Sequence, residues 1–163
     1  MHDDIVKLDL ENLLVVSPDV GGVVRSRAVA KVLGLSDLAI IDKRRDEANQ
    51  SKVVNVIGEV KNKECILVDD IADTAGTLCN AAKALKEKGA KDVYVYITHA
   101  VLSGDASQKI EKSQIKKLIT TDTIDNSRKV MKSKKIEIIS LAPMISEAMK
   151  RIANSTSVSS LFK

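Results

Sequence analysis

Three aspartates stand close together in the stretch ILVDDIADTAGT, which covers residues 66–77. Asp69 and Asp70 follow an apolar run, and Asp73 precedes a short segment of threonine, alanine and glycine. Carboxylates accept hydrogen bonds from hydroxyl groups and also bind metal ions. Small hydroxyl and glycine residues at the start of a helix instead offer donors to a phosphate. A sugar phosphate is one ligand that needs both, with its cis-diol at the aspartates.

The phosphate side of this hypothetical site would consist of Thr74, Gly76 and Thr77, with hydroxyl and backbone N–H donors at a helix start. A simple aspartate-rich helix cap explains Asp73. It does not explain two further aspartates at the end of a buried strand. We therefore favour a ligand site over a purely structural cap.

A second candidate is SPDVGG, residues 17–22, which follows another apolar run. Gly21 and Gly22 allow backbone amides to approach a ligand closely at the start of the next helix. Asp19 could hold Mg²⁺ against a phosphate chain. An ordinary strand-to-helix turn has the same composition, so both interpretations remain open at this level.

A third candidate is DKRR, residues 42–45. Lys43, Arg44 and Arg45 could clamp a polyanion, although such a charge run is more often a solvated loop. The polar stretch 43–52 lacks helical periodicity and predicts a mobile loop. His99 ends another apolar run, where a structural role is the better interpretation.

These candidates need a scaffold that brings strand ends together. Short β-branched runs predict strands, and segments of helical spacing alternate with them. The predicted strands are 13–17, 38–42, 53–58, 65–70, 93–99, 117–122 and 136–141. The predicted helices are 22–34, 76–89 and 143–154, with a shorter one at 104–112. Most of the strands are apolar throughout, which indicates a mainly parallel, doubly wound α/β sheet with helices on both faces. Ligands collect beyond the C-terminal strand ends of such sheets.

Composition limits the partners. A chain of 163 residues with 44% hydrophobic content suits a single domain with its own core. The net charge of +4 favours anionic ligands, yet scattered basic residues and only 2% aromatic content argue against nucleic acid. The sequence has no apolar run of membrane-spanning length. Cys65 and Cys79 lie outside any metal-ligand spacing, which predicts reduced thiols in a cytoplasmic protein.

The motif ILVDDIADTAGT resembles the ribose-phosphate site of the type I phosphoribosyltransferase-like fold. The flanking segments VVSPDVGGVVRSRAVAK, LAIIDKRRDEAN, NVIGEVKNKEC and SVSSLF extend this resemblance to the ribose-phosphate diphosphokinase family, also called phosphoribosyl pyrophosphate synthetases. The similarity runs from about Leu13 to Phe162. It implies transfer of the diphosphoryl group of ATP to the C1 hydroxyl of ribose 5-phosphate, which yields AMP.

The resemblance also implies roles for individual residues. Lys43 would be the catalytic lysine and Arg45 would contact substrate phosphate. The ribose hydroxyls would bind at Asp69 and Asp70. Asp19 would hold Mg²⁺. The pyrophosphate loop would comprise Asp19, Val20, Gly21 and Gly22, and the 5-phosphate loop Asp73, Thr74, Ala75, Gly76 and Thr77.

Members of this family have two similar domains, and the motifs here match the C-terminal one. We therefore expect an N-terminal lead-in over 1–12 and one phosphoribosyltransferase-like domain over 13–163, with the family's N-terminal domain absent. ATP would be shared with that domain or a neighbouring subunit of a homo-oligomer. On this basis we expect binding of ribose 5-phosphate but little turnover by the chain alone. Two alternatives are a stand-alone phosphoribosyltransferase and a non-catalytic regulatory partner of a full-length synthetase.

Overall fold

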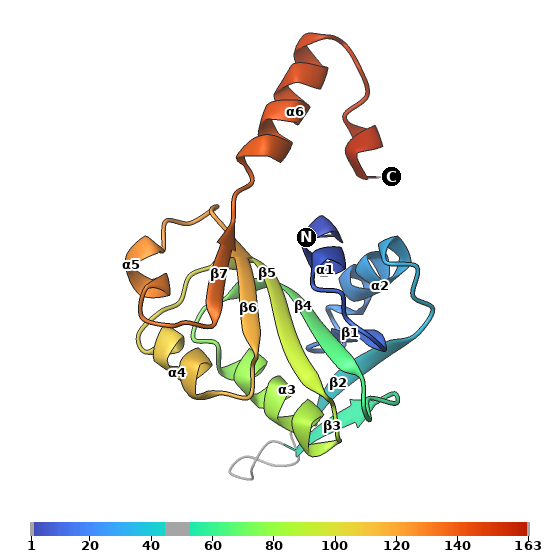
Figure 1. The fold of residues 1–163 in the computed structure, drawn as a ribbon, viewed down its shortest axis with the longest axis vertical. Coiled ribbons are helices and arrows are strands. Elements are labelled where there is room, and N and C mark those ends of the chain that lie inside the picture. Colours follow the sequence, from blue (N-terminus) through green and yellow to red (C-terminus); the bar gives the residue numbers. More distant parts are fainter. Residues whose placement is uncertain (1, 45–52, 163) are drawn as a thin grey trace.

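The computed structural model describes residues 2–44 and 53–162, which form one sheet with helices on both faces (Figure 1). The sheet has seven strands in the order β3-β2-β1-β4-β5-β6-β7. Their bounds are Leu13–Ser17 (β1), Leu38–Arg44 (β2), Val53–Ile57 (β3), Glu64–Ala72 (β4), Asp92–Ala100 (β5), Lys117–Thr121 (β6) and Ile136–Ile139 (β7). All neighbouring pairs are parallel except β2 and β3. The predicted doubly wound, mainly parallel α/β fold is confirmed.

The helices alternate with the strands as the sequence predicts. They are His2–Lys7 (α1), Val23–Val32 (α2), Gly76–Glu87 (α3), Ala106–Lys112 (α4), Ser127–Val130 (α5) and Ala142–Ala153 (α6), followed by a 3₁₀ turn at Ser159–Phe162 (η1). Gly34 and Gly89 follow α2 and α3 with φ angles of 71° and 88°, which only glycine adopts at little cost. The sequence does not predict α1, α5 or η1, because each is too short to show a clear period.

Two apolar clusters lie on opposite faces of the sheet. On one face, Leu67 and its neighbours in the strands pack against Leu78 and Leu85 of α3 and Ile110 of α4. On the other face, Ile66 and Tyr96 pack with Ala30 of α2 and Ile5 of α1. Alternate residues of the central strands therefore serve opposite cores, which explains why β4 begins with an unbroken buried run.

The pairing of β2 with β3 corrects the predicted strand ends. The strand predicted to stop at Asp42 continues to Arg44, and β3 returns antiparallel to it, with Lys43 opposite Val54. The connection spans residues 45–52, which is too short for the crossover that a parallel pair requires. The predicted loop over 43–52 is therefore wrong for its first two residues, and the remainder lies outside the described residues.

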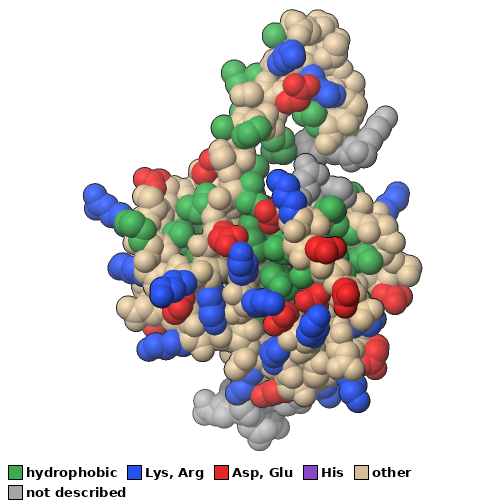
Figure 2. All heavy atoms as spheres, viewed as in Figure 1, with side chains coloured by type: hydrophobic (Ala, Val, Ile, Leu, Met, Phe, Trp, Pro, Cys, Tyr) green, Lys and Arg blue, Asp and Glu red, His purple; other side chains and the backbone are tan. Residues whose placement is uncertain are grey.

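Helix α6 extends away from the body of the domain (Figure 1), and none of its residues is buried. One side is apolar: Met144, Ile145, Met149 and Ile152 are between 44% and 67% exposed. Figure 2 shows hydrophobic side chains along α6 and on the body beneath it. No helix in the described part of the chain is long and apolar enough to cross a membrane.

Candidate functional site

The candidate residues meet where the order of the strands changes direction. Strands β1 and β4 are parallel neighbours, with Val16 opposite Leu67, so their C-terminal ends lie at the same edge. After β1 the chain continues through α2 toward β2, whereas after β4 it continues through α3 toward β5. The two connections leave opposite faces, which makes this edge the switch point where doubly wound sheets form their ligand-binding crevice.

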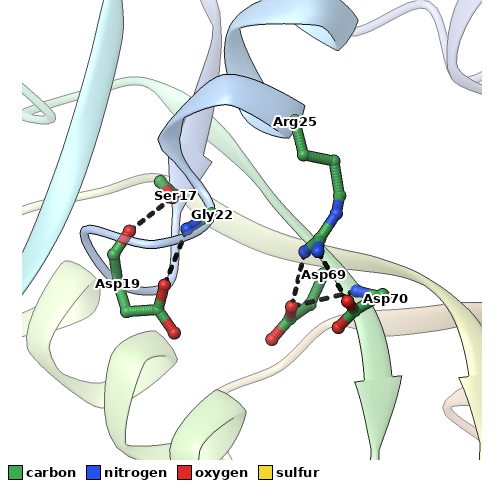
Figure 3. A network of polar contacts seen from close by, with 6 residues as sticks. All are labelled: Ser17, Asp19, Gly22, Arg25, Asp69 and Asp70. Carbon is green, nitrogen blue, oxygen red and sulfur yellow. Dashed lines mark hydrogen bonds and ion pairs between the residues drawn. The ribbon is translucent and has the colours of Figure 1, made fainter.

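The loop after β1 is tightly constrained. The buried Ser17 hydroxyl donates to the Asp19 carbonyl oxygen at 2.6 Å, and the Gly22 amide donates to Asp19 Oδ1 at 2.8 Å (Figure 3). A Cβ atom on Gly22 would lie 2.9 Å from Ser17 Oγ, which is closer than real side chains allow. A larger residue at position 22 would therefore require the Ser17 side chain to move. Val20 and Gly21 lie on the exposed side of the same loop.

The two adjacent aspartates are joined by an arginine that the sequence analysis did not select. Arg25, the third residue of α2, donates from Nη1 to Asp69 Oδ1 at 2.8 Å and from Nη2 to Asp70 Oδ2 at 2.6 Å (Figure 3). The Asp70 amide also donates to Asp69 Oδ1 at 2.9 Å. Asp69 and Asp70 lie within β4, which continues to Ala72, so the predicted strand end at Asp70 is two residues short.

The surroundings of Asp69 and Asp70 shift the pKa values of the two carboxyl groups in opposite directions. Burial is the main cause that raises the pKa of Asp69, whose side chain is 16% exposed. Desolvation also acts on Asp70, but the charge of Arg25 and the bond with Asp69 outweigh it and lower the pKa of Asp70. The Arg25 side chain is 39% exposed, so this network lies at the rim of the crevice.

The predicted phosphate loop lies between β4 and α3. Ala75 adopts a left-handed conformation, with φ of 58°, immediately before α3 begins at Gly76. The segment after β5 holds this loop, because the Val101 and Ser103 amides donate to the carbonyl oxygens of Ala72 and Asp73. Asp73 is not the helix cap that its position suggested, since the cap residue is Ala75 and makes no side-chain cap bond.

The threonines of this loop face outward. Thr74 and Thr77 are exposed on either side of Gly76, and Ala75 is buried. Left-handed backbone at the start of a helix turns successive N–H groups toward the same side, which produces an anion-binding concavity. The arrangement can therefore hold a phosphate close to the aspartates of β4.

Of the two basic residues predicted to act in catalysis, Lys43 and Arg45, only Lys43 lies within the described residues. Lys43 lies in β2, and its backbone pairs with Val54 of β3. Arg45 lies outside the described residues. The roles expected of Lys43 and Arg45 thus remain predictions.

His99 is on the same edge of the sheet, opposite Ile71 of β4. Its Nδ1 shares a hydrogen bond with the Thr123 hydroxyl at 2.9 Å, and the Thr121 and Thr123 hydroxyls both donate to the Thr98 carbonyl oxygen. These contacts tie the ends of β5 and β6 together, in keeping with a structural role for His99.

The cysteines are free, and burial raises the pKa of Cys65 to about 12, as suits an unreactive thiol.

Comparison with known proteins agrees with this geometry. A family model described as "Phosphoribosyl synthetase-associated domain" matches residues 44–163. The ribose-phosphate pyrophosphokinase of Hyphomonas neptunium is 54% identical over 163 residues, covering 99% of this chain and 52% of that protein. The protein of the same name from Pasteurella multocida is 49% identical, covering 99% of this chain and 51% of that protein.

Solved structures show the same fold. The phosphoribosylpyrophosphate synthetase of Mycobacterium smegmatis superimposes with a TM-score of 0.79 at 36% identity, covering 89% of this chain and 46% of that one. The APRTase of Giardia lamblia gives a TM-score of 0.58 at 18% identity, over 73% of this chain and 75% of that one, a likeness of fold alone. The domain is thus a type I phosphoribosyltransferase-like α/β domain. The chain belongs to the phosphoribosyl synthetase-associated domain family, and it spans about half the length of the curated relatives it matches.

Proposed function

We propose that this chain is the phosphoribosyl-binding half of a ribose-phosphate diphosphokinase and binds ribose 5-phosphate at the crevice between β1 and β4. From the resemblance of its motifs we assign it to the C-terminal domain. The observation that carries the proposal is the meeting of Asp69 and Asp70 with a left-handed phosphate loop that leads into α3. The identity to ribose-phosphate pyrophosphokinases over almost the whole chain supports the same reaction class.

In this proposal the sugar ring lies beside β4. Its 2- and 3-hydroxyls donate to the carboxylates of Asp69 and Asp70, which are acceptors at the crevice rim. Its 5-phosphate accepts hydrogen bonds from the loop of Asp73, Thr74, Ala75, Gly76 and Thr77. The C1 hydroxyl is then presented toward the loop of Asp19, Val20, Gly21 and Gly22, whose backbone would hold the diphosphoryl group.

The reaction transfers one group between two oxygens. The C1 oxygen of ribose 5-phosphate forms a bond to the β-phosphorus of ATP, the bond from that phosphorus to the oxygen bridging it to the α-phosphate breaks, and AMP leaves. The C1 hydroxyl releases its proton to the solvent as the new bond forms. Lys43 and Arg45 would supply positive charge to the phosphoryl oxygens, because such transfers depend chiefly on positioning and charge neutralisation.

The oxygen ligands at this edge suit Mg²⁺, which commonly takes one or two carboxylates together with substrate phosphates. Asp19 is the residue we expect to hold it, since only Oδ1 is engaged by the Gly22 amide. Within residues 2–44 and 53–162 no group of three or more metal-binding side chains converges, so the substrate would have to complete the coordination. When bound, the ion would offset the negative charge of the phosphate chain.

Calorimetric titration with ribose 5-phosphate, with and without Mg²⁺, tests this function. We expect saturable binding that Asp69→Ala and Thr77→Ala each weaken about tenfold or more, since each removes a hydrogen bond to a charged group. Release of diphosphate from phosphoribosyl pyrophosphate in the presence of a nucleobase would instead assign the site to a stand-alone phosphoribosyltransferase. Absence of sugar-phosphate binding, combined with stable association with a full-length synthetase, would favour a regulatory partner.

A further inference from the structure

Arg25 has no place in the function proposed above, although its side chain extends from α2 to both Asp69 and Asp70 (Figure 3). Its guanidinium reaches two carboxylates that are adjacent in the chain, with one N–H group on each. A planar guanidinium has the fixed fork geometry for such a double contact, and a lysine ammonium does not. Asp69 and Asp70 side chains would project to opposite faces of an ideal strand, yet both contact the same guanidinium.

The charges explain why the contact matters. Two adjacent carboxylates repel each other, and Asp69 is also partly buried, which disfavours its ionised form. The positive charge at 2.6–2.8 Å from both groups offsets this repulsion. Arg25 engages one oxygen of each carboxylate, so each side chain keeps a second oxygen that can accept a hydrogen bond from a hydroxyl.

The position of Arg25 in the fold adds a second link. It lies in the first turn of α2, directly after the loop of residues 19–22, while its partners lie in β4. Through Arg25, the helix that follows the predicted diphosphate loop contacts the predicted diol site. Solvent weakens the contribution to folding of the contact with Asp70, whose side chain is 54% exposed, whereas Asp69 is only 16% exposed.

We infer that Arg25 is a positioning residue for pentose recognition, which holds Asp69 and Asp70 side by side so that both can accept hydrogen bonds from the 2- and 3-hydroxyls. The inference rests on the proposed function, because it assigns the diol to this pair of aspartates. It predicts that Arg25 determines the discrimination between a ribose and a deoxyribose phosphate. The contribution of the phosphate loop to binding is independent of Arg25.

The test compares the affinities of ribose 5-phosphate and 2-deoxyribose 5-phosphate by calorimetry for the unchanged chain and for Arg25→Gln. Arg27→Gln is the matched control, since Arg27 is an exposed arginine of the same helix. We expect the unchanged chain and the control to prefer ribose 5-phosphate about tenfold or more, as for a hydrogen bond to a charged acceptor. Arg25→Gln should reduce this preference to about twofold or less, with a smaller loss of affinity for the deoxy sugar, which still has its 3-hydroxyl.

A further variant, Arg25→Lys, keeps the positive charge but lacks the planar guanidinium that contacts both carboxylates. It should therefore restore only part of the preference for ribose 5-phosphate. Thermal unfolding of each variant establishes that it is folded. If Arg25→Gln keeps the preference, binds ribose 5-phosphate more tightly, or weakens both sugars equally, the positioning role is wrong. If the unchanged chain binds neither sugar, the proposed function fails and this inference fails with it. If it binds both without preference, the diol assignment alone is overturned.

Discussion

At the scale of single residues, Ala75 has a left-handed backbone conformation in the predicted phosphate loop. A left-handed backbone brings Cβ of an L-residue too close to its own carbonyl oxygen, at a cost of about 1–2 kcal/mol. Ala75 is 4% exposed and is followed directly by the first turn of α3. Strain of this kind persists where the surrounding structure imposes it, often in ligand loops.

Two substitutions at Ala75 should therefore change the stability by different amounts. Ala75→Gly should change the free energy of unfolding by less than about 1 kcal/mol, because relief of the strained φ is offset by a more flexible unfolded chain. Ala75→Val should lower it by about 1–3 kcal/mol, since a β-branched side chain tolerates this φ poorly and has little space. Urea unfolding measures both. Equal stability of the two variants would contradict the described conformation.

The sequence could indicate part of the site at this scale. Asp69, Asp70 and the small residues after Asp73 form a continuous segment, so local pattern was enough to select them. Arg25 lies within VVRSRAVAK, where nothing distinguishes it from Arg27. Its role depends on β1 and β4 being neighbours, which is a property of the sheet order and not of the local sequence.

At the scale of elements, a carboxylate joins α4 to the segment before β7. Glu111 Oε2 accepts hydrogen bonds from the Ser133 hydroxyl at 2.6 Å and from the Lys134 amide at 2.9 Å. The bond from Ser133 is the main cause that lowers the pKa of Glu111 below its ordinary 4.5. The folded state therefore releases this proton more readily than the unfolded chain does.

A lowered pKa in the folded state gives stability that is present above the unfolded value and is lost as pH falls through the folded value. We expect Glu111→Gln to lower the urea midpoint at pH 7 and to reduce the loss of stability between about pH 5 and pH 3. If Glu111→Gln lost as much stability between about pH 5 and pH 3 as the unchanged chain does, the contribution assigned to Glu111 would be wrong.

The core is concentrated on the sheet and not on α6. Leu67 in β4 is 0% exposed, whereas Met149 in α6 is 64% exposed. Leu67→Ala should therefore lower the free energy of unfolding by about 2–5 kcal/mol, and Met149→Ala should change it by no more than about 0.5 kcal/mol. Guanidinium unfolding of the two variants tests this contrast. A large effect of Met149→Ala would place α6 within the cooperative core.

The elements differ in how far sequence could predict them. Apolar β-branched runs located the sheet because both faces of its central strands are buried. The apolar pattern does not predict the last two residues of β4, because the polar Asp69 and Asp70 interrupt the apolar run. The antiparallel return of β3 could not be inferred from apolar pattern, which does not encode strand direction.

At the scale of the whole molecule, the chain spans about half the length of its curated relatives. Its described tyrosines, Tyr94 and Tyr96, are buried in the sheet and are not placed to stack on an adenine ring. We therefore expect the purified 163-residue chain to bind ribose 5-phosphate yet form AMP from ATP only slowly or not at all. A coupled assay for AMP measures this. Rapid, ribose-5-phosphate-dependent AMP formation by the chain alone would contradict the expectation.

The most direct measurement is the position of ribose 5-phosphate in crystals of this chain soaked at saturating concentration. We expect its ring hydroxyls within hydrogen-bond distance of Asp69 and Asp70 and its phosphate on the backbone between Thr74 and Thr77. Electron density for the sugar elsewhere, or an unoccupied crevice in crystals whose lattice leaves that edge open, would contradict the pentose-phosphate site.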